Sequence, residues 1–555
     1  MTVWQTSPIT RQRDMHRLGL WRGETLCQRL AHWTESTPDH IAVIDPANRE
    51  ALTGTAPQRL SYLQLNELAD IFANALLDLG LERGDRCMVQ LPNVVELMAL
   101  YCAASKLGVV ISPIPVQYGH HEVTTLGAVL QPKAFLAAAS FNGRSLADVG
   151  LSILPARQVL AVDDSFVLEA VAGHSSALRQ RIDAYQSRYP LDANNILTVC
   201  WTSGTTGTPK GVPRSHNMWL ASADMTAQGC DYRDGETLLN PFPMVNMSAL
   251  GGFVFPGIDR GCRIVLHHPL DLGVYLSQIQ HEAVQFTIAP PALLNKLALE
   301  PDLWARFDFQ HLRGIGSGSA PLSPAMIETF EQRYGISIYN IYGSNEGIAL
   351  IASPKTTPDR EARASLFRLS ESAQARGFSS RVIDVETGEP VQEIGAQGEL
   401  CFSGPTVFDG YLDHDGAGVF CANGDFRTGD VVEISSADGL SYRIAGRCKE
   451  LINRGGMKIS PVELDLLLEA FPGLAEAAVC ADPDPVLGER ICACIVCQPE
   501  VTPPTLDEVI AYLRAKDIAV FKLPERLLVL DALPRNPLGK VLRHELTAQL
   551  QDTAC

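Results

Sequence analysis

The sequence predicts an α/β protein with a large N-terminal domain of layered α/β subdomains, residues 1–448, and a small α+β C-terminal domain, residues 449–555. Three observations support this prediction. At 555 residues the chain is longer than one hydrophobic core ordinarily supports. Strand and helix patterns alternate through most of the chain. After "YRIAGRCKELINRGGMKISP" this alternation gives way to a shorter, compact pattern.

The clearest elements lie near the start of the N-terminal domain. Ser61 and Gln64 fit a capping box, and apolar residues then recur at helical spacing as far as Gly80, which predicts a helix. A strand is expected at 87–91 and a helix at 94–107, and the stretch "VVISPI" that follows reads as a buried strand. Because a strand, a helix and a second strand in this order pair in parallel, the pattern predicts an α/β layer.

The same alternation continues along the chain. Strands are expected at "LTVCW", "RIVLH" and "QFTIA". In the C-terminal domain we expect a helix from Pro461, two strands, "AEAAVCA" and "RICACIVC", and a second helix, "LDEVIAYLRA". The polar stretch 353–365 is expected to be a surface loop.

The composition excludes several classes of function. With 46% hydrophobic and 19% charged residues the chain is typical of a soluble globular protein, and it contains no apolar run long enough to span a membrane. Its start has no apolar stretch followed by a small-residue cleavage site, which argues against secretion and predicts a cytoplasmic protein. The net charge of −18 argues against nucleic-acid binding.

The 14 cysteines lack the spacing of a disulfide framework, which is typical of a reducing compartment. Cys492, Cys494 and Cys497 form one cluster. Their alternate spacing inside an apolar run is that of a buried strand, whereas thiolate metal sites usually show paired Cys-x₂₋₄-Cys spacing. We therefore interpret this cluster as structural.

Residues 202–211, "TSGTTGTPKG", combine glycines, hydroxyl side chains and one lysine. Glycines let backbone N–H groups approach a ligand, while the hydroxyls and Lys210 add donors and positive charge, so the segment predicts a polyphosphate site. It is not a Walker A loop, because its glycine and lysine spacing differs from that motif. The stretch "GIGSGSAP" lacks the dinucleotide fingerprint, because Ser319 occupies the third glycine position.

Together with motifs farther along, this segment resembles the phosphate-binding signature of the adenylate-forming (ANL) superfamily. That superfamily contains acyl-CoA ligases, aryl-acid adenylating enzymes, peptide-synthetase adenylation domains and firefly-type luciferases. The other motifs follow in the family's order and read "SGSAPLSP", "NIYGSNEG", "GELCFSGPTVFDGYL", "FRTGD", "GRCKELINRGGMKISPVE" and "LPRNPLGKVLRHEL". A chance match of so many motifs in one order is negligible.

The resemblance implies a two-step reaction. A carboxylate attacks the α-phosphorus of ATP, giving acyl-adenylate and pyrophosphate, and a thiol then attacks the acyl carbon and releases AMP. An AMP-forming carboxylic acid–CoA ligase is implied, with ATP and CoA as substrates, Mg²⁺ as cofactor and a mobile C-terminal domain that alternates between two poses. The alternative is a free-standing adenylating enzyme that transfers the acyl group to the pantetheine thiol of an acyl carrier protein. A homodimer is compatible with both.

Two further classes have less support. No residue specifically favours an oxidoreductase of luciferase type. The intact Lys210, Glu346, Asp430 and Lys540 argue against a non-catalytic binding module.

The resemblance also implies roles for individual residues. Lys540 would bridge the substrate carboxylate and the α-phosphate, Lys210 would hold the β- and γ-phosphates, and Glu346 with Thr202 would bind Mg²⁺. Asp430 would accept both ribose hydroxyls. The implied nucleotide-binding set is Thr202, Ser203, Gly204, Thr205, Thr206, Gly207, Lys210, Gly318, Ser319, Ala320, Pro321, Asn340, Ile341, Tyr342, Gly343, Ser344, Asn345, Asp430, Arg447 and Lys540.

Lys449 resembles the family's hinge residue, about which the C-terminal domain would swing after adenylation. The swing would withdraw Lys540 and bring Gly455, Gly456 and Lys458 to the pantetheine thiol. The two glycines would allow close approach of the pantetheine arm.

The implied acyl pocket consists of Met244, Val245, Asn246, Met247, Gly318, Gly347 and Ile348. It has no acid or base that could pair with a charged amino acid, so a medium-chain, alicyclic or aromatic acid fits best.

The chain departs from the family at a few positions. Val245 and Asn246 replace an aromatic–histidine pair, and Met247 stands where hydroxybenzoate-activating relatives carry an asparagine that reads the ring hydroxyl, which argues against a hydroxybenzoate. Asn345 replaces the usual threonine before the Mg²⁺ glutamate and keeps a polar oxygen for metal or phosphate. Asn536 replaces a threonine before the final Gly-Lys, which is a minor change.

Overall fold

The structure is a computed structural model that describes residues 7–171, 176–202, 209–318, 322–412, 418–454, 457–484, 486–516, 518, 520–535 and 541–552. The chain forms two compact units. The first comprises Met1–Ser379 with Phe402–Phe426, and the second comprises Ser380–Cys401 with Arg427–Cys555. The predicted division at residue 449 follows the expected hinge and stays a prediction.

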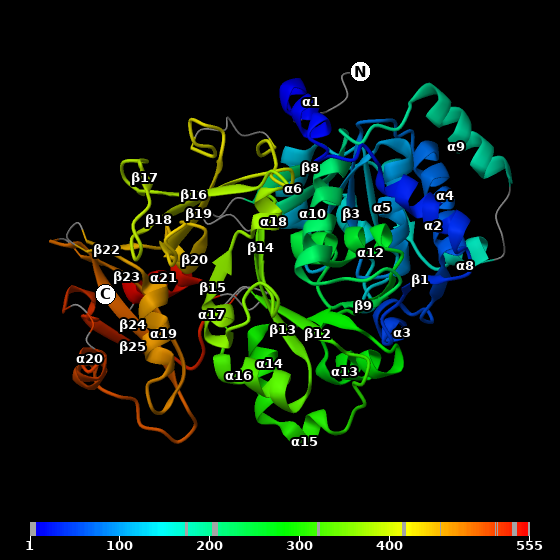
Figure 1. Ribbon diagram of the computed structural model, residues 1–555. Coiled ribbons are helices and arrows are strands. Elements are labelled where there is room, and N and C mark those ends of the chain that lie inside the picture. Colours follow the sequence, from blue (N-terminus) through cyan, green and yellow to red (C-terminus); the bar gives the residue numbers. More distant parts are fainter. Residues whose placement is uncertain are drawn as a thin grey trace. The chain divides into compact units, whose positions relative to one another are not determined.

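A six-stranded sheet lies in the first unit, with the strand order β6-β5-β3-β4-β7-β8. Its strands β3 and β8 are labelled in Figure 1. Its strands are parallel to their neighbours except β8, which is antiparallel to β7. Helices α4, α5 and α9 pack on one another, and α5 packs on β4 and β7. The bounds are β3 Arg86–Gln90, β4 Val110–Pro113, β5 Ala134–Ala138, β6 Val159–Val162, β7 Ile196–Thr202, β8 Lys210–Ser215, α3 Arg49–Thr53, α4 Tyr62–Asp78, α5 Val95–Leu107, α6 His120–Leu130, α7 Ala147–Gly150, α8 Ser165–Val171 and α9 Ser176–Arg188.

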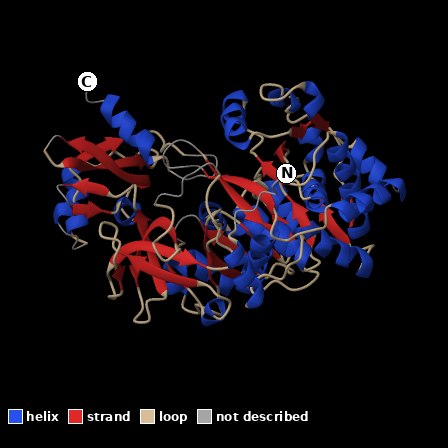
Figure 2. Cartoon of the chain, turned by 90° about the horizontal axis from the view of Figure 1, so that it is seen from above, coloured by secondary structure: helices blue, strands red, loops and turns tan. Residues whose placement is uncertain are grey.

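An eight-stranded sheet in the same unit has the order β14-β13-β12-β11-β9-β10-β1-β2. Only its end strands, β14 and β2, are antiparallel to their neighbours. Figure 2 shows the helices beside the strands of these sheets. The bounds are β1 Ile41–Ile44, β2 Arg59–Ser61, β9 Thr237–Asn240, β10 Arg263–Leu266, β11 Phe286–Ile288, β12 Gly314–Gly318, β13 Ser337–Gly343, β14 Ala349–Ala352, α10 His216–Gly229, α11 Met247–Ala249, α12 Phe255–Asp259, α13 Leu272–His281, α14 Pro291–Leu299, α15 Pro301–Trp304, α16 Pro324–Glu328, α17 Arg360–Ser365 and α18 Glu371–Gln374.

The predicted elements of this unit are confirmed. Helix α4 begins after Ser61, whose side chain accepts a hydrogen bond from the Gln64 amide in the expected capping box. Helix α5 ends at Gly108, which adopts a left-handed conformation with a φ of 68°. The apolar residues of both helices lie in the largest hydrophobic core, which also contains residues of β3, β4, β5, β6 and β7.

The expectation that 353–365 is a surface loop is wrong in its second half. Residues Arg360–Ser365 form α17, which Asp359 caps by accepting the amide hydrogen of Ala362 at 2.8 Å. Arg363 is buried because its guanidinium pairs with Glu331 and donates to the carbonyl oxygen of Thr357 at 2.7 Å. The polar composition of this stretch indicated a surface loop, although one of its charged residues forms a buried ion pair.

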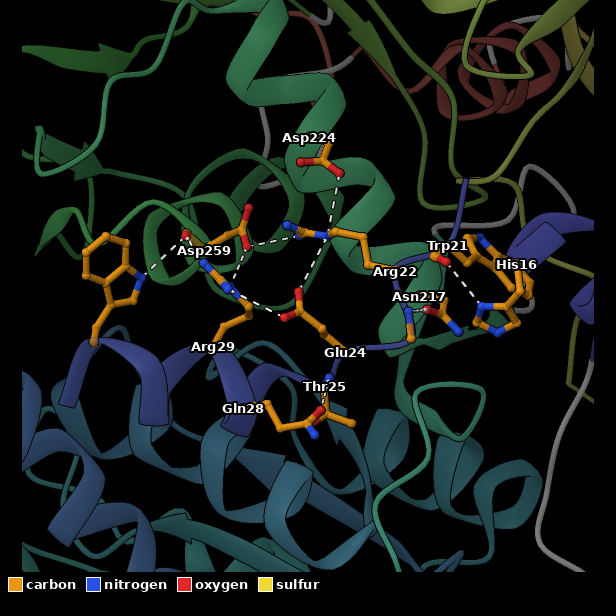
Figure 3. Close-up of polar contacts among 12 residues, drawn as sticks. His16, Trp21, Arg22, Glu24, Thr25, Gln28, Arg29, Asn217, Asp224 and Asp259 are labelled. Atoms are coloured by element: carbon orange, nitrogen blue, oxygen red, sulfur yellow. Dashed lines mark hydrogen bonds and ion pairs between the residues drawn. The ribbon is translucent and has the colours of Figure 1, made fainter. Parts of the chain in front are cut away.

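Within the first unit, the N-terminal segment contacts the end of α12, as Figure 3 shows. Arg22 and Arg29, which flank the start of α2 (Leu26–Ser36), both lie 2.9 Å from the carboxylate of Asp259. Trp33 also donates to the Asp259 carbonyl at 3.3 Å. These contacts hold the last residue of α12 against the N-terminal segment, which contains the short helix α1 (Ile9–Arg17).

The second unit contains two groups of strands. Strands β20, β19, β18, β16 and β17 are neighbours in that order, and β22, β21, β24 and β23 form another sheet in which β25 pairs with β24. The bounds are β16 Ser379–Ile383, β17 Pro390–Val391, β18 Gln397–Ser403, β19 Phe426–Ile434, β20 Ser441–Arg447, β21 Ile452–Arg454, β22 Met457–Ile459, β23 Leu474–Asp484, β24 Gly488–Cys497, β25 Arg526–Val529, α19 Pro461–Glu469, α20 Leu506–Arg514 and α21 Arg543–Asp552. The helix–strand–strand–helix order expected after Pro461 is confirmed.

The prediction that Cys492, Cys494 and Cys497 lie in one strand is confirmed, but Cys497 is half-buried and packs on a different core. Cys492 and Cys494 lie in β24 and are fully buried, and Cys480 of β23 pairs in register with Cys492. The three sulfurs lie within 4.8 Å of one another inside an apolar cluster. The alternate spacing reflects the pleat of β24, which turns both thiols to one face.

The layered first unit and the α+β second unit confirm the predicted fold class, while the mobility of the C-terminal part stays a prediction. Among the described residues, no helix combines the length and apolar character needed to cross a membrane.

Candidate active site

The hairpin of β7 and β8 carries the ends of the predicted phosphate segment. Thr202 is the last residue of β7 and pairs in register with Lys210, the first residue of β8. The strands thereby hold the two ends of the segment side by side. Five of its predicted phosphate-binding residues lie outside the described residues, namely Ser203, Gly204, Thr205, Thr206 and Gly207.

Lys210 and Glu346 both contact the side chain of Tyr411. The ammonium of Lys210 lies 4.7 Å from the ring centre, and the Tyr411 hydroxyl donates to Oε1 of Glu346 at 2.7 Å. Glu346 is only 8% exposed. A cation and a carboxylate from motifs far apart in the sequence are thus joined by a residue between them. Tyr411 was missed as a site residue, although it lies in the quoted motif "FDGYL".

Backbone contacts fix the positions of these three side chains. The amide of Leu412 donates to the carbonyl oxygen of Gly211 at 2.8 Å, and the amide of Phe408 donates to that of Glu346 at 2.9 Å. At Gly347, which follows Glu346, φ is +110° and an added Cβ would lie 2.1 Å from the carbonyl oxygen of Thr406. Only glycine fits this close approach, so the turn after Glu346 is tightly specified.

Asn345 connects the phosphate hairpin to the predicted acyl pocket. Its Oδ1 accepts the amide hydrogen of Met247 at 2.8 Å, and its Nδ2 donates to the carbonyl oxygen of Trp201 at 3.2 Å. Both ends of the side-chain amide are therefore used within the first unit. In this structure the residue that replaces the family's threonine links two segments of the chain.

Arg214 is a buried cation beneath the Glu346 turn. Its guanidinium donates to the carbonyl oxygen of Asn345 at 3.1 Å and to the Ser222 hydroxyl at 2.7 Å. It also lies 4.4 Å from the ring centre of Trp219. Burial lowers the pKa of Arg214, whose side chain is 0% exposed. Nothing in "KGVPRSH" distinguishes this arginine from an exposed one, so sequence analysis missed it.

The predicted adenine-contacting segments lie at neighbouring strand ends. Gly318 of β12 is in register with Ile341 of β13, and a Cβ at Gly318 would lie 2.0 Å from the Ile341 carbonyl oxygen. Ser319, Ala320 and Pro321 lie outside the described residues.

Asn340 in β13 carries a buried acceptor atom. Its Nδ2 donates to the carbonyl oxygens of Arg363 and Ala364 at 2.9 and 3.0 Å. Its Oδ1 has no hydrogen-bond partner in the described part of the chain, although the residue is only 2% exposed. A buried acceptor without a donor favours a ligand that supplies one. Farther along β13, Tyr342 packs on Phe367 with ring centres 5.6 Å apart.

Four of the predicted acyl-pocket residues, Met244, Val245, Asn246 and Met247, lie at the start of α11. Met244 is held by its backbone, whose amide donates to Asn93 at 2.9 Å and whose carbonyl accepts from Tyr101 at 2.6 Å. Asn246 caps α11 by accepting the Ser248 amide hydrogen at 3.1 Å. Val245 and Met247 are half-buried.

The chain then continues from α11 through a π-helical turn, Leu250–Val254, into α12. Such π-turns occur frequently at functional sites. The turn lies near Arg214, because Trp219 stacks on Phe255 of α12 with ring centres 4.9 Å apart. Ile348, predicted for the pocket, is fully buried.

Two residues that are predicted to bind the nucleotide form an ion pair with each other in the second unit. Asp430 of β19 and Arg447 of β20 are in register, with Arg447 Nε 2.6 Å from Oδ1 of Asp430. Asp430 is 5% exposed. The predicted hinge residue Lys449 is exposed and follows β20.

The remaining predicted residues can be described only in part. Gly455, Gly456 and Lys540 lie outside the described residues, and Lys458 lies in β22. On either side of the segment that contains Lys540, Arg535 and Val541 pair as an antiparallel bridge.

The donor set at Thr202 and Glu346 fits a hard divalent cation. A hydroxyl and a carboxylate are oxygen ligands of the kind Mg²⁺ prefers. Their segments adjoin through Asn345, which precedes Glu346 and bonds to Trp201, the neighbour of Thr202.

The fold and the site define an adenylate-forming enzyme, and comparison with known proteins identifies the family. The model of the AMP-binding enzyme family matches residues 30–412, and that of the AMP-binding enzyme C-terminal domain matches residues 463–540. The chain therefore belongs to the AMP-binding enzyme family.

Individual relatives cover nearly the whole chain. A salicylyl-CoA synthase / salicylate adenylyltransferase from a Streptomyces species is 31% identical over 98% of this chain and 96% of its own length. The medium-chain fatty-acid–CoA ligase of Escherichia coli strain K12 is 28% identical over 100% of this chain and 96% of its own. The crystal structure of ATP-bound MatB from Rhodopseudomonas palustris matches with a TM-score of 0.80 at 25% identity, covering 95% of this chain and 100% of that one.

Proposed function

We propose that the protein is an AMP-forming carboxylic acid–CoA ligase that converts an apolar acid, ATP and CoA to acyl-CoA, AMP and pyrophosphate through an acyl-adenylate. One observation carries the proposal: Lys210 lies over the ring of Tyr411, and Glu346 accepts a hydrogen bond from the hydroxyl of the same residue. A phosphate-binding cation and a metal-binding carboxylate must lie within reach of one triphosphate for the carboxylate to attack its α-phosphorus. Membership of the AMP-binding enzyme family supports the same reaction.

Several of the predicted residues would each bind one part of the nucleotide. The buried Oδ1 of Asn340 suits the exocyclic amine of adenine, which would supply the missing donor. Asp430 would accept the ribose hydroxyls, and its ion pair with Arg447 orients the carboxylate. Lys210 and the hydroxyl-rich segment after Thr202 would hold the β- and γ-phosphates.

Mg²⁺ would be held by Glu346 and Thr202, and when bound it neutralises charge on the triphosphate. The hydrogen bond from Tyr411 leaves the second carboxylate oxygen of Glu346 as the candidate ligand atom. Tyr411 would thus orient both Glu346 and Lys210 before the nucleotide arrives.

The acid is an unsubstituted medium-chain, alicyclic or aromatic one. Asn246 is used as a helix cap and Met247 presents a thioether, so neither offers a free amide to a ring hydroxyl. Among the relatives, the medium-chain fatty-acid–CoA ligase fits this pocket chemistry better than the salicylate enzyme does. We also propose a cytoplasmic location, which the lack of a disulfide among the described cysteines supports.

An acid panel tests the proposal. Exchange of labelled pyrophosphate into ATP should require one of octanoate, cyclohexanecarboxylate or benzoate, and salicylate should support less exchange. With CoA added and no carrier protein, the same acid should give acyl-CoA. If exchange occurs but only a carrier protein accepts the acyl group, the enzyme is a free-standing adenylating enzyme. If no acid supports exchange, the proposal fails.

Lys540→Ala tests the two-step scheme. The substitution should lower acyl-adenylate formation by orders of magnitude, because Lys540 would stabilise charge that develops at the α-phosphate. Thioester formation from supplied acyl-adenylate should stay largely intact, because the second step would use the other pose. An equal loss of both half-reactions in a folded variant would contradict the assignment.

A further inference from the structure

Three cysteine thiols lie close together inside the second unit. Cys480 belongs to β23, and Cys492 and Cys494 belong to β24. Their sulfur atoms all lie within 4.8 Å of one another, and Sγ of Cys480 is 3.7 Å from Sγ of Cys494. The antiparallel ladder fixes this arrangement, because Cys480 and Cys492 are paired residues and Cys494 follows on the same face of β24. None of the three belongs to the proposed nucleotide or acyl site.

The distances between the sulfur atoms suit three bonds to one central atom. A metal–thiolate bond has a length of about 2.3 Å, so three such bonds hold their sulfur atoms roughly 4 Å apart. The separation of Cys480 and Cys494 is already close to this value. A central atom would take the place of the thiol hydrogens between the sulfur atoms, so it needs no separate cavity.

The surroundings of the thiols provide sulfur but no fourth ligand. The group contains three cysteines and, among the described residues, no histidine or carboxylate joins it. A structural zinc ion usually has four ligands, so three thiols alone do not complete its coordination. The group therefore favours an atom that three thiolates satisfy. The apolar residues of the same cluster are Ala478, Leu533, Leu546 and Leu550, with Val496, Leu528, Leu530 and Val541 packed against it.

The cations beside the thiols already have carboxylate partners. Arg526 of β25 is in register with Cys492 and lies 3.2 Å from the carboxylate of Asp482. Arg543, the first residue of α21, forms an ion pair with Asp465. An anionic thiolate complex would therefore place a charge in this apolar cluster without a cation of its own, which is costly. A neutral complex avoids this cost.

We propose that Cys480, Cys492 and Cys494 bind trivalent arsenic, which reaches them as arsenous acid, As(OH)3. Three S–As bonds form and three As–O bonds break, and each thiol proton leaves with a hydroxyl group as water. The product is neutral, and its arsenic needs no fourth ligand because a lone pair occupies the remaining position. Arsenic keeps its oxidation state, so no oxidant or reductant takes part. The proposal is independent of the proposed ligase activity.

Arsenous acid would reach the buried thiols through local opening of α21. This helix packs on β23, and its Leu546 and Leu550 belong to the same apolar cluster as the thiols. Its Thr547 hydroxyl donates to the carbonyl oxygen of Ala481 at 3.0 Å. A short helix held by few contacts can open without unfolding of the whole protein. We therefore expect binding to be slow, with a rate that levels off at high arsenite because opening becomes limiting.

Native mass spectrometry with sodium arsenite tests the proposal, on the reduced full-length protein under argon. The wild type should gain the mass of one arsenic minus three hydrogens, because all three hydroxyl groups leave as water. Binding by two thiols would keep one hydroxyl group and give a species heavier by one water. Cys494→Ala should therefore lose the three-thiol species. Cys497→Ala, in the same strand but outside the group, is the matched control and should keep it.

Two further measurements keep the test decisive if Cys494→Ala does not fold, which circular dichroism would show. Cys480→Ala removes the thiol of the other strand and should cause the same loss. X-ray absorption at the arsenic edge needs no variant, and in the wild type it should show three sulfur neighbours and no oxygen. The proposal fails if the wild type binds no arsenic or keeps an arsenic–oxygen bond. It also fails if Cys497→Ala loses the three-thiol species or if a folded Cys494→Ala or Cys480→Ala retains it.

Discussion

The first unit buries two arginines in different ways. Arg49 lies between Asp45 and Glu96; burial alone would lower its pKa, but the two carboxylates outweigh burial and raise it. Arg214 is held by carbonyl oxygens, a hydroxyl and the face of Trp219, and burial lowers its pKa. Its hydrogen bonds in the described part of the chain go to two carbonyl oxygens and a hydroxyl, and no carboxylate forms an ion pair with it there.

The different partners of the two arginines indicate different roles for their charges. A buried cation whose charge is cancelled by its neighbours contributes mainly to the fold, since removal leaves uncompensated acids. The charge of a buried cation without such partners is not compensated and can interact with a nearby anion. For Arg214 the nearby anion is Glu346: burial lowers the Arg214 pKa, and the Glu346 charge opposes that lowering. Asn345, the neighbour of Glu346, accepts a hydrogen bond from Arg214. We therefore expect Arg49 to govern stability and Arg214 to govern activity.

The largest effect on stability is expected from Arg49→Met. The substitution leaves Asp45 and Glu96 buried beside each other without a cation, and breaking such a pair costs about 3–5 kcal/mol of unfolding free energy. Urea unfolding followed by tryptophan fluorescence would measure the loss. Arg214→Met is the matched control because it makes the same chemical change, and an equal loss in both variants would remove the distinction.

The next effect is a loss of activity in Arg214→Met. Asn345 and Ser222 lose a charged donor, which costs about 1–3 kcal/mol of stability. Pyrophosphate exchange should fall by roughly 10–100-fold, because Arg214 supports the turn that carries Glu346. A loss of about 1–3 kcal/mol there would raise the activation barrier by a similar amount. The KM for Mg-ATP should rise more than the KM for the acid, and Arg214→Lys should restore part of the activity. A variant with normal exchange would show that Arg214 is structural only.

The pH dependence of stability is a smaller test of the Arg49 cluster. Burial raises the pKa of Glu96 from 4.5 to about 7 and also raises that of Asp45, both of which face Arg49. Between pH 4.5 and about 7 the folded protein holds a proton on Glu96 that the unfolded chain releases. The unfolding free energy therefore falls as the pH rises through this range. Glu96→Gln cannot titrate and should show a flatter profile by urea unfolding at pH 5.5 and 7.5. Identical slopes would contradict the assignment.

The two arginines also mark what could be predicted from the sequence. Periodicity and capping predicted α4, β3 and α5, because their signals are local. The motifs predicted Lys210 and Glu346. They did not predict that Tyr411 would join them, because that contact spans 65 positions between Tyr411 and Glu346.

Long-range pairing explains the other misses. Arg214 bonds to a carbonyl 131 positions away, and Arg363 pairs with Glu331 from a stretch whose polar composition indicated a loop. A sequence shows which residues can carry charge, but burial and partners decide how that charge is used.

The smallest effect is expected from Asn345→Thr. This variant changes the side chain of residue 345 but keeps the backbone carbonyl to which Arg214 donates. The threonine keeps the carbonyl that accepts from Arg214 but loses the side-chain amide that joins Met247 to Trp201. Each neutral hydrogen bond contributes about 0.5–1.5 kcal/mol, so kcat/KM for the acid should fall by roughly two- to tenfold while the KM for Mg-ATP changes little. Asn345→Ser should behave alike in pyrophosphate exchange. A hundredfold loss, or a large change in the Mg²⁺ requirement, would instead show that the Asn345 oxygen binds metal or phosphate. Arg214 would then support a ligand residue directly.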